Sequence, residues 1–115
     1  MTSAARRVRL EESAPIFEAL GDATRLKLVA RLCDAGPMSI ARLTSGTAMT
    51  RQGVTKHLRV LARAGIVRDA RRGRERIWDI DARRLAIARR FLEQASQRWD
   101  EALGRLRALV EEDQG

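Results

Sequence analysis

Residues 50–63 carry side chains whose types and spacing suit the binding of nucleic acid. Successive helical residues are turned by about 100°, and one arc of about 100° holds Gln52, Thr55, Lys56, Arg59 and Arg63, while Thr50 and Arg51 lie at the N-terminal end. Val54, Leu58 and Leu61 fall on the other side, which we expect to face the core. Guanidinium, ammonium, amide and hydroxyl groups pair with base edges and phosphates. The residues predicted to read DNA are Thr50, Arg51, Gln52, Thr55, Lys56, His57 and Arg59.

A second basic cluster surrounds Gly73, within a segment (70–75) that we expect to form the tip of a β-hairpin. Only Glu75 opposes its positive charge. A basic hairpin that follows a DNA-reading helix suits the phosphate backbone or the adjacent minor groove, as the wing of a winged helix does. The predicted wing contacts are Arg71, Arg72, Arg74 and Arg76.

Both basic segments have a simpler interpretation. Charged residues are common on solvated helix faces, and a charged loop can be merely flexible. A solvated face usually mixes both signs of charge, however, and no acidic residue occurs between positions 35 and 68. We therefore favour nucleic-acid binding over a solvated surface.

Metal binding and catalysis have little support in the sequence. His57 is the only histidine and Cys33 the only cysteine, whereas zinc sites use at least three protein ligands. We predict no metal and no cofactor, and expect His57 to be a boundary side chain or a phosphate contact. Cys33 could act as a nucleophile, but we expect a buried, inert thiol beside Leu28, Val29 and Leu32. No catalytic triad or glycine-rich phosphate loop is suggested by spacing, so we predict that the chain is not an enzyme.

The charge distribution also favours a polyanionic partner. The 115 residues carry a net charge of +8, and residues 51–76 alone contain nine basic and two acidic side chains. Charge focused in this way is typical of nucleic-acid binding. The first residues resemble no signal peptide, and no window approaches the roughly 18 apolar residues of a membrane span. We therefore expect a cytoplasmic protein.

The elements that would position these side chains follow from caps and periodicity. Ser13, Asp22, Ser39, Thr50 and Asp81 are predicted helix caps. Two short helices joined by a turn with glycine form a helix-turn-helix. Residues 1–12 are expected to form an N-terminal arm that is first basic and then acidic. In the second helix we expect Leu26, Val29 and Leu32 to face the core. The expected elements are helices over 13–20, 23–34, 40–44, 51–64 and 82–112, and strands near 66–67 and 77–80.

The last predicted helix carries an apolar stripe that its own domain cannot cover. Thirty residues span about 45 Å, whereas so small a domain is nearer about 30 Å across. A second copy of the chain is the simplest partner for the exposed part; the alternative is a helix that bends near Gly104 and folds back. The predicted dimer contacts on this helix are Leu85, Leu92, Trp99, Leu103, Leu106 and Val110.

Two segments resemble the ArsR/SmtB family of winged-helix repressors. Residues 17–26 (FEALGDATRL) are similar to the family's F-x-A-L-x-D-P-T-R-L, with Ala23 in place of proline. Residues 54–67 (VTKHLRVLARAGIV) are similar to V-S-x-H-L-x-x-L-x-x-A-G-L-V. The resemblance covers about residues 16–80. It implies a homodimer that binds operator DNA, usually represses transcription, and dimerises through its first and last helices, which adds Phe17 to the interface.

The resemblance does not extend to the family's metal-sensing sites. Metal-sensing members carry a Cys-x-Cys pair, or histidine and acidic pairs on the last helix. Here Cys33 stands alone and residues 82–115 contain no histidine. The chain therefore resembles the members without metal sites. The sequence leaves three alternatives for the signal to which the protein responds: a small molecule, a partner, or nothing beyond its own concentration.

The sequence thus predicts one mainly helical (α+β) domain over 1–115. It comprises a winged helix-turn-helix DNA-binding core over 13–80 and a dimerisation helix over 81–112. The predicted function is sequence-specific binding to double-stranded DNA, as a homodimeric repressor of a palindromic operator. Two alternatives remain: a basic module that binds DNA or RNA without sequence preference, and an adaptor that captures a protein through the last helix.

Overall fold

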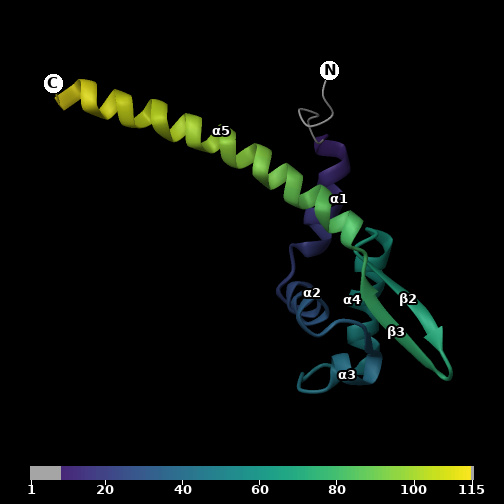
Figure 1. The fold of residues 1–115 in the computed structure, drawn as a ribbon. Helices are drawn as coiled ribbons and strands as arrows, with labels where there is room; N and C mark the ends of the chain where they lie inside the picture. The colour runs from purple at the N-terminus through teal and green to yellow at the C-terminus, as the bar shows by residue number, and fades with distance from the viewer. Residues whose placement is uncertain (1–8, 115) are drawn as a thin grey trace.

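The computed structural model describes residues 9–114 and shows a mainly helical chain with a small antiparallel sheet (Figure 1). The prediction of an α+β winged helix-turn-helix is confirmed. The residues 1–8 of the predicted N-terminal arm lie outside the described part. The elements are α1 (Leu10–Leu20), α2 (Ala23–Ala35), β1 (Met38–Ser39), α3 (Ile40–Thr44), α4 (Arg51–Arg63), β2 (Val67–Arg72), β3 (Glu75–Ile80) and α5 (Ala82–Gln114).

The core fixes α4 against the rest of the domain. Val54, Leu58 and Leu61 are fully buried, as predicted from their spacing. Leu43 of α3 and Ile66, which follows α4, are also fully buried in the same cluster. Burying one such side chain contributes about 1.5–3 kcal/mol. The apolar side of α4 is therefore held firmly, and its polar side is left outside.

The sheet contains three strands, one more than the sequence indicated. Its order is β1-β3-β2, and Met38 pairs with Trp78. A strand of two residues shows no alternation, so the sequence pattern could not reveal it. Because a two-stranded hairpin is marginal alone, β1 and the buried Trp78 help to hold the wing on the core.

The hairpin tip is tighter than the predicted segment 70–75. Strands β2 and β3 stay paired up to Arg72 and Glu75, so only Gly73 and Arg74 form the connection. Gly73 has φ 62°. Two-residue hairpins of type II′ place glycine at the first central position, because that position needs a positive φ. The pairing therefore extends through arginines that the sequence suggested were in a loop.

Helix α1 begins earlier than predicted. It starts at Leu10 after Arg9, so Ser13 is a buried residue inside the helix and not its cap. Glu11 and Glu12 lie in the first turn, where negative charge interacts favourably with the helix dipole. Because α1 begins at Leu10, Pro15 lies beyond the first turn, where it has no N–H to donate to the carbonyl oxygen of Glu11.

Two predictions about the buried face of α2 are wrong. Leu28, Val29 and Leu32 face the core, whereas Leu26 is 51% exposed. Cys33 is also exposed. At about 100° per residue, the three buried positions span one arc of about 100°. Cys33 lies about 40° and Leu26 about 60° beyond the edge of this arc. The spacing of Leu26 with Val29 and Leu32 therefore indicated a buried face that is turned away from the real one.

Helix α5 runs without interruption from Ala82 to Gln114 and passes through Gly104 (Figure 1). The Asp81 side chain accepts a hydrogen bond from the Arg83 N–H (3.1 Å), which caps its first turn as predicted. Near its start, the Phe91 ring packs on Phe17 of α1 with centroids 5.5 Å apart. The rest of α5 projects away from the body, and the molecule measures 69 × 39 × 22 Å.

Candidate nucleic-acid interface

Helices α3 and α4 form the helix-turn-helix, and both begin at caps predicted from the sequence. The Ser39 hydroxyl accepts a hydrogen bond from the Arg42 N–H (3.3 Å). The Thr50 hydroxyl accepts one from the Gly53 N–H (3.0 Å). Each cap satisfies a donor that the first turn of a helix leaves free. The N-terminal end of α4 is thereby fixed at the exposed surface.

Arg31 of α2 holds the turn between the two helices. Its guanidinium donates to the carbonyl oxygens of Leu43 (2.7 Å), Arg42 (3.0 Å) and Ser45 (3.3 Å). These carbonyls lie at the end of α3, where the helix offers them no partner. The sequence pattern did not identify this role. The one signal in the sequence is the shortness of α3, because so short a helix leaves most of its backbone carbonyls without a partner inside the helix.

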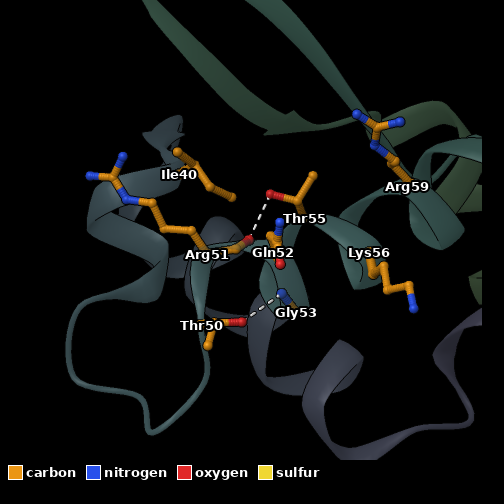
Figure 2. A pocket seen from close by; sticks show the side chains of 8 residues that line it. All are labelled: Ile40, Thr50, Arg51, Gln52, Gly53, Thr55, Lys56 and Arg59. Carbon is orange, nitrogen blue, oxygen red and sulfur yellow. Dashed lines mark hydrogen bonds between the residues drawn. The ribbon is translucent and has the colours of Figure 1, made fainter.

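The polar face of α4 is exposed to solvent near the N-terminal end of the helix. Arg51, Gln52, Lys56 and Arg59 are exposed. Figure 2 shows the side chains of Arg51, Lys56 and Arg59 spreading apart around a surface hollow. Six of the seven predicted reading residues are thus brought to one place, and His57 is not among them. The hollow is lined by Ile40, Thr50, Arg51, Gln52, Gly53, Thr55, Lys56 and Arg59.

The hydroxyl of Thr55 already uses its hydrogen. It donates to the carbonyl oxygen of Arg51 at 2.7 Å (Figure 2). A hydroxyl has one donor and two acceptor lone pairs, so Thr55 retains only acceptor capacity and its methyl group. Gln52 offers both a donor and an acceptor. The two side chains therefore present different chemistry to a ligand.

The wing carries the predicted arginines on two paired strands. Arg71 lies directly opposite Arg76 across the sheet. Like charges in this position repel, and Arg76 is relieved by an ion pair with Asp69 (3.1 Å). Arg71, Arg72 and Arg74 are exposed and have no ion-pair partner among residues 9–114. Three of the four predicted wing arginines are therefore available to an anionic partner.

Comparisons with known proteins agree with this arrangement. The family model described as a helix-turn-helix domain matches residues 20–70. HTH-type transcriptional regulator Rv2034 of Mycobacterium tuberculosis is 32% identical over 97 residues, which cover 84% of this chain and 87% of that relative. The crystal structure of an ArsR family transcriptional regulator superposes with a TM-score of 0.71 at 26% identity, covering 83% of this chain and 97% of that one. The chain belongs to the ArsR family of helix-turn-helix transcriptional regulators.

A further solved structure supports the assignment. An ArsR-like transcriptional regulator from Rhodococcus sp. RHA1 is 30% identical with a TM-score of 0.70, and the match covers 86% of this chain and 92% of that one. The resemblance stated from the two sequence motifs is therefore confirmed. Like these relatives, this ArsR-family chain is a transcriptional regulator and not an enzyme.

In this ArsR-family regulator, His57 points away from the polar face of α4. Its Nδ1 lies 3.4 Å from a guanidinium nitrogen of Arg25 and 3.9 Å from the Asp22 carboxylate. The His57 side chain is 23% exposed. Both partners belong to the start of α2, so the structure separates His57 from the other residues predicted to read DNA.

The residues predicted to form the dimer interface fall into two groups. Phe17 and Leu85 are half-buried and pack on the core of the same chain. The others form an exposed apolar stripe along α5. Leu92 is 45% exposed, and the four residues nearer the C-terminus are exposed by about half or more: Trp99, Leu103, Leu106 and Val110.

Two negative observations apply to the described part of this regulator. Within residues 9–114, no group of three or more His, Cys, Asp or Glu side chains is placed to hold a metal ion. No helix in the same range is both long and apolar enough to span a membrane.

Proposed function

We propose that this ArsR-family chain is a homodimeric transcriptional repressor that acts in the cytoplasm on a palindromic operator. The observation that carries the proposal is the division of α4 into two faces. Val54, Leu58 and Leu61 are fully buried, and the opposite face presents free basic and amide groups around an open hollow. In helix-turn-helix proteins, the N-terminal part of the second helix contacts base edges in the major groove.

The base contacts are assigned by chemistry. Gln52 can make the paired donor and acceptor contacts that adenine requires, and Arg51 those of guanine. Thr55 accepts from an exposed amino group or packs its methyl on thymine, because its hydrogen is already donated to Arg51. Lys56 and Arg59 lie further along the exposed face and suit phosphates.

The wing supplies binding that does not depend on sequence. Arg71, Arg72 and Arg74 are charged, exposed and without an ion-pair partner among the described residues. A partner with regularly spaced phosphates satisfies them, and it also relieves the repulsion between Arg71 and Arg76. These contacts place the domain on DNA and add affinity, while α4 discriminates between sequences.

A dimer follows from the exposed stripe on α5. Residues 99–113 of this helix are exposed over their whole length, although the stripe within them contains leucine, tryptophan and valine. A second copy that covers the stripe produces two-fold symmetry. Two identical DNA-reading helices then require two inverted half-sites, about one helical turn apart. Such a protein represses when its operator overlaps a promoter.

A matched pair of glutamine substitutions tests the proposed reading face. Duplexes are first selected from a random pool by the wild-type protein. Gln52→Ala should lose about 1–3 kcal/mol of discrimination at one base pair of each half-site. Gln97→Ala makes the same chemical change at an exposed position of α5 and should bind as the wild type does. Equal discrimination by both variants would remove Gln52 from the interface.

A further inference from the structure

Three helices meet at His57. It belongs to α4, Asp22 caps the start of α2, and Ala19 lies in the last turn of α1. The Asp22 carboxylate accepts a hydrogen bond from the Arg25 N–H (3.1 Å) and lies 3.9 Å from His57 Nδ1. The Arg25 guanidinium lies 3.4 Å from the same Nδ1 and donates to the Ala19 carbonyl oxygen. Asp22 and Arg25 thus connect His57 to the ends of both α1 and α2.

His57 has a suitable partner whether or not its ring is protonated. A neutral ring with a free lone pair on Nδ1 accepts from Arg25, whereas a protonated ring is attracted to Asp22. The hydrogen bond from the backbone N–H of Arg25 is the main cause that lowers the pKa of the Asp22 carboxyl group. Burial, the next-largest influence, raises this pKa, and the charges of Arg25 and His57 each lower it by less. Asp22 is therefore ionised near neutral pH and always available to the ring.

The buried apolar side of α4 holds the helix in the core, and the His57 contact can add to this hold at one edge of that side. Apolar burial is not directional in itself, whereas a polar contact between fixed partners is. Lys56 and Arg59 lie on the outward arc, so a rotation of α4 about its axis moves them across the DNA surface. A directional polar contact at the flank of the helix opposes that rotation. His57 occupies that flank, about 60° from the Val54 direction.

We propose that His57 is a positioning residue that sets the rotation of α4 through Asp22 and Arg25, and that it does not contact DNA. This inference rests on the proposed function, since it assumes that α4 reads base pairs. It replaces the expectation that His57 is one of the DNA contacts. It also gives Arg25 and Asp22, which lie away from the reading face, a role in base selectivity.

Two substitutions at His57 separate positioning from phosphate contact. The amide of asparagine occupies nearly the place of Nδ1, whereas that of glutamine reaches toward the place of Nε2. If Nδ1 positions the helix, His57→Asn retains selectivity and His57→Gln loses it. If Nε2 binds phosphate, the order is reversed. Asp22→Ser changes the other partner of the contact: it removes the carboxylate, and serine is still a good helix cap.

Each variant is assayed with the best duplex from the random-pool selection and with a scrambled duplex of equal composition. We expect His57→Gln and Asp22→Ser each to lower the affinity ratio of the two duplexes about tenfold, and the double variant to lower it no further. The slope of log affinity against log salt should stay at the wild-type value. Lys56→Gln is the matched control for a lost phosphate contact, and its slope should fall by about 0.9 for each subunit bound.

Several results would overturn the proposal. The first is a salt slope for His57→Gln that falls as far as the slope for Lys56→Gln. The second is that His57→Gln keeps the selectivity and His57→Asn loses it. The third is that the effects of His57→Gln and Asp22→Ser add in the double variant. A wild-type protein that does not prefer its selected duplex contradicts the proposed function instead. In that case, the same double-variant cycle in chemical unfolding decides whether the His57–Asp22 contact exists, since additivity there also excludes positioning.

Discussion

The Nε of Arg84 donates a hydrogen bond to the carbonyl oxygen of Ala64 at 2.9 Å, and so joins the first turn of α5 to the end of α4. Between them, Gly65 has φ 81° and lets the Arg84 side chain lie against the backbone. A Cβ at Gly65 would lie 3.0 Å from Arg84 Nε. The helix proposed to dimerise and the helix proposed to read DNA are therefore tied together by one side chain.

Removing this donor should destabilise the fold. Arg84→Met keeps most of the methylene stem but leaves the Ala64 carbonyl without its partner, which should lower the free energy of unfolding by about 0.5–1.5 kcal/mol. Chemical denaturation measures the loss. Arg90→Met, at an exposed position of the same helix, is the control and should change stability little. Equal stability of the two variants would show that the bond contributes nothing.

The ionisation of Asp22 should make part of the stability depend on pH. Its pKa in the folded chain is lowered from the ordinary value of 3.8, chiefly by the Arg25 N–H. Its carboxylate therefore stabilises the fold above pH 3.8, and this contribution is lost as the pH falls through the lower folded value. Denaturation from pH 2 to 7 should show the wild type's advantage over Asp22→Asn shrinking below pH 3.8. An advantage that is constant or grows in acid would contradict this assignment.

Neutralising the unpaired wing arginines should weaken binding to every duplex alike. Replacing Arg71, Arg72 and Arg74 together with glutamine removes three phosphate contacts in each subunit, and each lost contact flattens the salt slope by about 0.9. The affinity ratio of selected to scrambled DNA should stay nearly constant. Asp69→Asn is the opposite control, since it releases Arg76 and should strengthen binding to both duplexes. A change confined to the selected duplex would mean that the wing reads bases.

The exposed stripe of α5 should hold two copies together. Leu106→Glu places a charge in the stripe and should produce monomers at micromolar concentration, where the wild type should sediment as a dimer. Ala108→Glu introduces the same charge on the opposite side of the helix and should remain dimeric. If the wild type is itself a monomer, the stripe binds some other partner and the adaptor interpretation gains support.

Local sequence patterns predicted the elements that local chemistry determines. Asp22, Ser39 and Thr50 cap their helices through side-chain oxygens, as expected. The apolar spacing of α4 correctly identified its buried residues. The start of α1 was missed because its cap at Arg9 involves no side-chain hydrogen bond. Strand β1 was missed because its two residues acquire their structure only from pairing with β3.

The candidate site was predictable in composition but not in its supporting contacts. The exposed arc of α4 follows from helical periodicity, so Gln52 and Lys56 could be assigned to it. The partners of His57 lie more than 30 residues away in the sequence, at Arg25 and Asp22, and no local pattern connects them. Arg31 was missed for the same reason, since it reaches carbonyls 11 to 14 residues further along the chain.

Selection of duplexes by the wild-type chain from a random DNA pool tests the central claim most directly. The account predicts enrichment of two inverted half-sites about 10 base pairs apart, bound at least about 10³-fold more tightly than a scrambled duplex at physiological salt. A pool without an enriched motif, with equal affinity for random and selected DNA, would contradict sequence-specific reading by α4.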